Sequence, residues 1–242
     1  MLGYSCLTRT ISSTNAWRAR KHINQAYFDN VRDIWYPRPE VIRTYGRLNR
    51  PGCPIMYAAA SHHTAILELR PEVGDVFTVL QLRLTDQSKH PHVMELGVAE
   101  RASQFGTSSS VRLLENTAVG RHFVRGHKNK NVLIRSFLAR EFTRVVNRGQ
   151  EHQFKLSIAI SEILLDNPKI DGIEYPSMAG DIAAFKGGEN IALKPASADR
   201  LYTADTCWVS VVEGTVSSPP EGFLMRCVRR ARSIKQDGAI VW

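Results

Sequence analysis

Apolar and polar positions alternate most clearly at residues 76–84, VFTVLQLRL, and this period of two predicts a strand with one buried face. A short apolar run at 54–60, PIMYAAA, predicts a buried strand shortly before it. Between the two, Ser61 is a suitable N-cap for a helix over HHTAILELR, and Pro71 marks the point where that helix should stop. The pattern therefore predicts a strand, a helix and a second strand in succession.

Longer periods in the apolar pattern predict further helices, at 16–35, 98–104 and 132–147. Residues 155–167, KLSIAISEILLDN, fit both a strand and a helix, and their length, together with the stop at Asn167-Pro168, favours a helix. Strands are expected at 170–175, 190–194 and 207–213. Because strands and helices mix without regular β-α-β alternation, the predicted fold class is α+β.

The composition is that of an ordinary globular protein of 242 residues, with 43% hydrophobic and 23% charged residues and a formal charge of +9. No run approaches the roughly 20 apolar residues of a membrane span, so we expect no membrane segment. The charge favours anionic partners such as nucleic acid, an acidic protein or a phosphate-bearing small molecule, without choosing among them. A basic cluster at Arg226–Lys235 is the best sign of nucleic-acid binding, although a solvated helix face explains it equally.

The four cysteines are scattered without a Cys-x-x-Cys pair, which fits structural thiols in a reducing compartment, and we expect a cytoplasmic protein. The eight histidines are not spaced as ligand partners, so no metal site is expected. Residues 1–28 are basic and carry no acid, as in organellar transit peptides. A helical surface segment or an upstream start codon explains that composition as well.

Three polar side chains, Arg47, Tyr57 and Glu68, interrupt a segment that is otherwise built like core. Glu68 follows small and apolar helix neighbours, so it is either a solvated helix residue or a carboxylate in a cleft that stabilises positive charge. Tyr57 is either a core aromatic or a ring that stacks on a planar ligand. Arg47 is either a surface charge or a bidentate contact to phosphate oxygens.

A second polar segment lies far downstream, as DGIEYPSMAGD at 171–181 and GGENIALKP at 187–195. Its glycines permit sharp turns, and on spacing alone a plain hairpin-like connection is preferred. No Gly-x-Ser-x-Gly elbow, Walker loop or Gly-x-Gly-x-x-Gly loop is present in the sequence, so a serine hydrolase or a standard phosphate-binding loop is not supported.

Taken together, the two segments resemble the RES domain family, named for its Arg, Glu and Ser. The residues that carry the resemblance are Arg47, Asn49, Pro51-Gly52, Tyr57, Thr64-Ala65, Glu68, Asp171-Gly172, Tyr175-Pro176-Ser177 and Asn190-Ile191-Ala192-Leu193. The resemblance runs over about residues 40–200. It divides the chain into an N-terminal helical extension at 1–40, a RES-like catalytic domain at 41–218 and a basic C-terminal tail at 219–242, packed on the same domain.

The resemblance implies a fold similar to ADP-ribosyltransferases, with a mixed sheet core and surrounding helices. It also implies a toxin of a toxin–antitoxin pair that cleaves the nicotinamide–ribose bond of NAD+, with NAD+ as substrate, no cofactor and an Xre-type antitoxin as partner. Glu68, Arg47 and Ser177 would be catalytic, and Arg47, Tyr57, Ser177 and Asn190 would bind the substrate.

Several functional questions stay open at this level. Water as acceptor would make the protein a glycohydrolase, and inorganic phosphate would make it a phosphorylase. The alternatives are an ADP-ribosyltransferase that modifies a macromolecule and a non-enzymatic basic module that binds nucleic acid. If the protein is a RES toxin, it is expected to contact nucleic acid only through the antitoxin. The sequence does not decide whether the protein forms a homo-oligomer.

Overall fold

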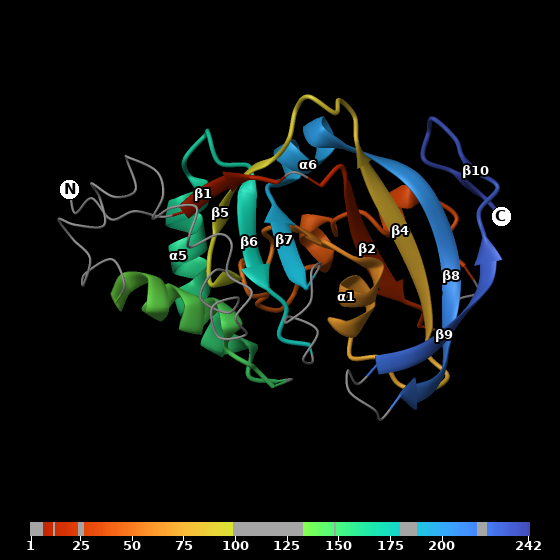
Figure 1. The fold of residues 1–242 in the computed structure, drawn as a ribbon, viewed down its shortest axis with the longest axis horizontal. Helices are drawn as coiled ribbons and strands as arrows, with labels where there is room; N and C mark the ends of the chain where they lie inside the picture. Colours follow the sequence, from red (N-terminus) through yellow and green to blue (C-terminus); the bar gives the residue numbers. More distant parts are fainter. Residues whose placement is uncertain are drawn as a thin grey trace.

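The computed structural model describes residues 7–11, 13–23, 27–98, 133–147, 149–179, 188–216 and 222–242. Its centre is a nine-stranded sheet in the order β1-β5-β6-β7-β3-β2-β4-β8-β9 (Figure 1). Only the β5–β6 pair is parallel among the pairs described, so the sheet is mixed. The predicted α+β class, with a mixed sheet and surrounding helices like that of ADP-ribosyltransferases, is confirmed.

The described elements fall into strands, α-helices and short 3-10 helices (η). The strands are β1 (Leu7–Thr10), β2 (Asn15–Lys21), β3 (Met56–Ala59), β4 (Val76–Leu84), β5 (His92–Glu95), β6 (Gly172–Pro176), β7 (Glu189–Leu193), β8 (Tyr202–Val216), β9 (Gly222–Arg230), β10 (Ser233–Ile234) and β11 (Ile240–Val241). The helices are η1 (Val31–Asp33), η2 (Pro39–Val41), α1 (His62–Leu67), a helix over 133–143, η3 (Glu151–Phe154), α5 (Lys155–Leu165) and α6 (Pro195–Leu201).

Several predicted elements are confirmed. The strand at 76–84 is β4, and the helix after Ser61 is α1, where the Ser61 hydroxyl accepts a hydrogen bond from the Thr64 N–H. That helix ends at Leu67, earlier than predicted, because Arg70 adopts a left-handed φ of 49° that no helix continues through. The ambiguous segment at 155–167 is helical as α5, because Ser157, Ile158, Ser161 and Leu164 recur at helical spacing on its buried face.

The helix predicted at 16–35 is wrong, because residues 15–21 form β2 in the middle of the sheet. Seven successive residue pairs, from Asn15↔Arg83 to Lys21↔Phe77, join β2 to β4. This pairing with a distant strand outweighs the local apolar spacing, which happened to match a helix. The segment at 1–40 is therefore not a helical extension, since β2 belongs to the central sheet. The helix predicted at 98–104 lies almost entirely outside the described residues.

The basic segment near the C-terminus is a strand as well. β9 pairs with the long strand β8 from Val216↔Gly222 to Trp208↔Arg230 and forms one end of the sheet. Figure 1 shows β9 in blue, lying beyond β8 at the side of the sheet opposite β1. Much of the cluster at Arg226–Lys235 therefore lies on a sheet edge, and the alternative of a solvated helix face is wrong.

One feature of the sheet creates room for a site. β2 and β3 are neighbours, yet a single residue pair, Trp17↔Ala59, joins them in register. β3 pairs over its whole length with β7, and β2 does so with β4. The two halves of the sheet therefore diverge next to β3, and α1, which follows β3 directly, lies beside the divergence (Figure 1).

Candidate active site

A cavity of about 330 Å³ opens where β2 and β3 diverge. It is bounded by β2, β3, the end of α1, the start of β7 and the segment at 145–146. Of the site residues predicted from the sequence, Arg47, Tyr57, Glu68 and Asn190 line it. Its volume lies at the low end of the roughly 300–1,000 Å³ typical of ligand pockets, so it suits one half of a dinucleotide better than the whole.

Glu68 is the C-cap of α1, and one of its carboxylate oxygens is tightly held. Oε1 accepts hydrogen bonds from the Ser177 hydroxyl at 2.5 Å and from the Asn190 side-chain amide at 2.6 Å. Within the described residues Oε2 accepts no hydrogen bond, and the side chain lines the cavity. The arrangement fixes a carboxylate at the cavity wall with one oxygen available to a ligand.

Ser177 and Asn190 come from neighbouring strands. Ser177 follows β6 directly and Asn190 lies in β7, and the Ser177 N–H donates to the carbonyl of Gly188. Ser177 is only 2% exposed, and it is not among the residues that line the cavity. Its predicted hydrogen bond to a substrate stays a prediction, because in this structure the hydroxyl donates to Glu68.

Tyr57 presents its ring to the cavity while its hydroxyl is fully engaged. The hydroxyl donates to Asn49 Oδ1 at 2.8 Å and accepts the Leu48 N–H at 3.0 Å. Burial raises the pKa of the Tyr57 phenol above its ordinary value, so the group stays protonated at physiological pH. Gly46 makes this contact possible, because a Cβ there would lie 2.3 Å from Asn49 Oδ1. Tyr57 is therefore suited to stacking rather than to proton transfer.

Arg47 lies at the cavity wall next to the end of the helix over 133–143. Its Nη1 donates to the carbonyls of Phe142 at 2.8 Å and Arg144 at 3.1 Å, where a cation is favourable at a helix C-terminus. The guanidinium also lies over the rings of Phe154 and Tyr175, 5.1 Å and 5.7 Å from their centroids. These contacts leave other N–H groups of a firmly oriented cation for an anion.

A comparison with protein families identifies the family to which the chain belongs. The family model described as RES domain matches residues 15–209 of the chain. The chain belongs to the RES domain family. This RES domain therefore falls among NAD-related toxin domains, which suggests an NAD-utilising enzyme in general terms. The comparisons with curated proteins and with solved structures found no match.

The family match begins at residue 15 and so includes β2, which carries a residue that the sequence analysis missed. Arg18 lines the cavity, and its guanidinium donates at 2.5 Å to both the Tyr57 and the Ile34 carbonyls. It thus provides a hydrogen-bond donor to the Tyr57 carbonyl of β3, at the place where β2 and β3 separate. Burial, and then the nearby Arg20, lower the pKa of Arg18 to about 9, so its charge persists at neutral pH.

The missed residue had a signal in the sequence. Arg18 follows Trp17 in NAWRARK, where an arginine lies among small and aromatic residues. The interpretation of 16–35 as a helix hid this signal, because a helix would place the Arg18 side chain on a solvated face. Arg70, at the end of α1, also lines the cavity and donates to the Val146 carbonyl at 3.3 Å. Among the residues that the structure describes, three arginines therefore line the cavity of this RES domain.

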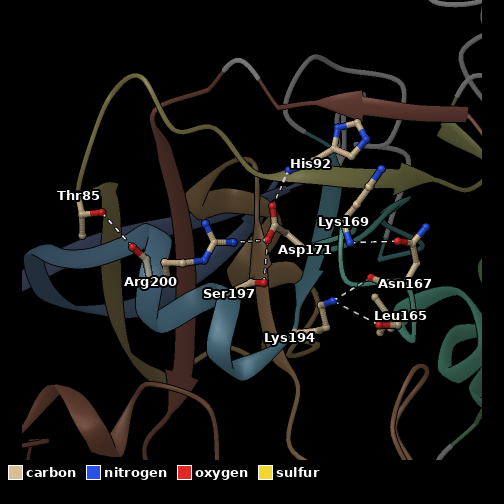
Figure 2. A network of polar contacts seen from close by, with 9 residues as sticks. All are labelled: Thr85, His92, Leu165, Asn167, Lys169, Asp171, Lys194, Ser197 and Arg200. Atoms are coloured by element: carbon tan, nitrogen blue, oxygen red, sulfur yellow. Dashed lines mark hydrogen bonds and ion pairs between the residues drawn. The ribbon is translucent and has the colours of Figure 1, made fainter.

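The second polar segment of the RES domain is anchored at the end of β6 that lies away from Ser177. Figure 2 shows Asp171 accepting from Ser197 and Arg200 at Oδ1, at 2.8 Å and 2.6 Å, and from the His92 N–H at Oδ2, at 2.9 Å. The next residue, Gly172, packs so closely that a Cβ would lie 2.3 Å from the Ala192 carbonyl oxygen. Asp171-Gly172 therefore serves to place β6, and through it Ser177.

Three further observations concern metal-binding groups, the described helices and Arg50. Among the described residues, no group of three His, Cys, Asp or Glu side chains is arranged to hold a metal ion. None of the helices in the described part of the chain has the length and apolar character that a bilayer span requires. Arg50, which lies close to Arg47 in the sequence, forms an exposed ion pair with Glu162 of α5 and is not among the residues that line the cavity.

Proposed function

We propose that this RES domain consumes NAD+ by breaking the bond between nicotinamide and ribose. The observation that carries the proposal is the Glu68 carboxylate, held at Oε1 by Ser177 and Asn190 and facing a cavity lined with arginines and aromatic rings. A preorganised carboxylate of this kind stabilises a cation that forms during a reaction, because it needs no reorganisation when the charge appears.

The chemistry requires little from the protein beyond that carboxylate. When the C1′–N bond breaks, its electron pair goes to the pyridinium nitrogen, and neutral nicotinamide leaves. The positive charge moves to the ribose as an oxocarbenium-like state, as in glycoside cleavage. Glu68 Oε2 stabilises this charge or accepts a hydrogen bond from a ribose hydroxyl. Addition of water and loss of its proton give ADP-ribose, and addition of inorganic phosphate gives the phosphorylated sugar.

The other cavity residues suit the remaining parts of the substrate. The Tyr57 ring would stack on nicotinamide or ribose, and Asn190 would help to place both Glu68 and the sugar. Arg47 and Arg18 are both held by backbone carbonyls, so their charges are oriented before a ligand arrives. Two fixed guanidinium groups match the two phosphates of the dinucleotide. The modest cavity volume would enclose the nicotinamide riboside half and leave the adenosine half near the opening.

The biological setting follows from this activity. A protein that drains NAD+ is harmful when it is expressed alone, so we infer a toxin controlled by an Xre-type antitoxin that covers the cavity opening. Leu69 and Val145, which are exposed and line the cavity, provide apolar contacts at such an opening. The antitoxin would also provide the contact with nucleic acid. Because the proposed substrate is a cytoplasmic metabolite, we infer that the protein acts in the cytoplasm.

The test is turnover of NAD+ by purified protein, followed by chromatographic separation of NAD+, nicotinamide and ADP-ribose. We expect release of nicotinamide by the wild type and its loss in Glu68→Gln, which keeps the shape of the side chain and removes its charge. Glu72→Gln is the matched control, because Glu72 is exposed and outside the cavity lining. Unchanged NAD+ at high protein concentration, with folding verified by circular dichroism, contradicts the proposal.

The same reactions identify the acceptor. Parallel incubations with and without inorganic phosphate separate a phosphorylase from a glycohydrolase, since only the former yields a phosphorylated product. NAD+ carrying a labelled adenylate moiety detects transfer to protein or nucleic acid, which would identify the ADP-ribosyltransferase alternative. Salt-dependent binding of nucleic acid that survives Glu68→Gln, with no NAD+ loss in the wild type, would instead identify a basic binding module.

A further inference from the structure

The last strand of the sheet has an unpaired edge. β9 is hydrogen-bonded to β8 and, within the described residues, to no other strand. Figure 1 shows it at the outer side of the sheet, and none of its residues is among those that line the cavity between β2 and β3. Its nine residues extend over roughly 30 Å at strand geometry. An edge of that length presents unpaired backbone N–H and C=O groups to any chain that can pair with it.

The side chains of β9 divide between its two faces. Phe223 and Met225 pack against a buried cluster that includes Ile66 of α1. Leu224 lies between them, points to the opposite face and is 58% exposed. Val228, which is 40% exposed, falls at a register shift and has no residue of β8 opposite it. Arg226 lies on the same face as Leu224 and is exposed, whereas the exposed Arg230 lies opposite Trp208 and so shares the face of Met225. Exposed apolar and cationic side chains therefore lie close together along β9, which suits a partner strand that carries both apolar and acidic residues.

The charges on this strand are not all neutralised within the protein. Arg226 pairs with Glu213 of β8, and Arg229 lies over the rings of Tyr27 and Trp242. Arg230 and the next arginine, Arg232, are exposed and form no ion pair with any residue that the structure describes. Two free cations thus flank the end of an open strand edge.

We propose that the β9 edge binds an extended, acidic polypeptide segment of another protein by β-strand addition, at a site separate from the cavity. A second copy of this chain is a poorer occupant, because antiparallel self-pairing centred on Arg226 would place the two Arg226 residues opposite each other. Nucleic acid is also poorer, since it would use the cations but not the exposed Leu224 and Val228, nor the backbone edge. An acidic strand uses all three features at once.

The experiment measures binding of a fluorescent nonapeptide of alternating glutamate and valine to the full-length protein by anisotropy. Two probes control for charge and for strand pairing: the same peptide with lysine in place of glutamate, and the acidic peptide with a central proline. The variant R230E/R232E reverses the free charges. The control R140E/K169E changes the net charge equally at exposed positions remote from β9. NAD+ turnover of all variants is measured in parallel.

We expect the acidic peptide alone to bind, its affinity to fall at least tenfold in R230E/R232E, and the control to change it less than twofold. Hydrogen exchange should show protection of β9 amides in the complex, and NAD+ turnover should be unaffected by either variant. Equal binding of the proline peptide, or equal loss in both variants, overturns the proposal. So does a dimer that R230E/R232E dissociates, or duplex DNA binding that this variant abolishes while the acidic peptide does not bind.

Discussion

Replacing Ser177 by alanine separates two roles that this residue could have in NAD+ cleavage. The substitution removes the hydroxyl that donates to Glu68 Oε1 at 2.5 Å and accepts from the Ala179 N–H at 3.2 Å. Ser177 is buried and outside the cavity lining, so the loss should reach the substrate only through Glu68. We therefore expect kcat to fall while the KM for NAD+ changes little.

The size of the effect follows from the hydrogen bond that is lost. A hydrogen bond to a charged group contributes about 2 kcal/mol. If losing this hydrogen bond raises the activation free energy by the same amount, because the carboxylate is less well placed in the transition state, kcat should fall roughly 30-fold. Asn190 still donates to the same oxygen at 2.6 Å, which is why complete loss of activity is not expected.

Initial rates over a range of NAD+ concentrations in Ser177→Ala, Glu68→Gln and the double variant test this reasoning. Because Ser177 acts through Glu68, its loss should matter little once Glu68 is already replaced, so the two effects should be strongly non-additive. A rise in KM at unchanged kcat would instead show that the hydroxyl contacts the substrate. Full additivity in the double variant would also refute a role that depends on Glu68.

Three other outcomes are expected. Gly172→Ala should destabilise the fold by about 3 kcal/mol and lower Tm by roughly 9 °C, because its Cβ would overlap a backbone oxygen of β7. Gly214→Ala should change Tm little, because its Cβ would meet only Leu224 Cβ at an ordinary contact distance of 4.0 Å, and thermal unfolding by circular dichroism compares the two variants. Burial raises the pKa of the Cys207 thiol to about 12, so iodoacetamide at pH 8 should modify the exposed Cys53 more than about 100-fold faster, as measured by mass spectrometry; equal rates would contradict this. Arg18→Met should raise the KM for NAD+ roughly tenfold. We also expect the KM of the wild type to rise as the pH passes about 9, where this guanidinium loses its charge, and Arg18→Met to remove that rise. An unchanged KM would show that Arg18 supports only the fold.

Local chemistry explains why the element that carries Glu68 could be predicted. Ser61 caps α1 through its side chain, so an adjacent residue specifies the start of the helix. Pro71 only limits how far the helix can extend, and the helix ends before it, at Leu67. The strand β4 was equally accessible, since its alternation of apolar and polar residues needs no distant partner to be recognised. Features that depend on neighbours in the sequence were therefore predicted well.

The strand β2 shows the opposite case. Its position in the centre of the sheet depends on pairing with β4, some 60 residues further along the chain, and nothing within 15–21 reveals that pairing. The strand also has few apolar residues, because Arg18 and Arg20 occupy positions in it. Their side chains donate hydrogen bonds to the backbone carbonyls of Ile34 and Asp33. Local spacing alone therefore favoured a helix.

The same reasoning explains why the arginines of the site could not be ranked from the sequence. Near the Pro-Gly turn, Arg47 and Arg50 look alike, yet one lies over Phe154 and Tyr175 and the other pairs with Glu162 at the surface. What distinguishes Arg47 is the pair of carbonyls at 142 and 144, about a hundred residues away, which orient its guanidinium. Arg18 is oriented in the same way by carbonyls of other segments. A fixed cation in this cavity is thus specified by backbone groups, which any residue type can supply. The fold therefore decides which arginine becomes the fixed cation of the site, and substitutions at 142 or 144 should leave the charge of the site intact.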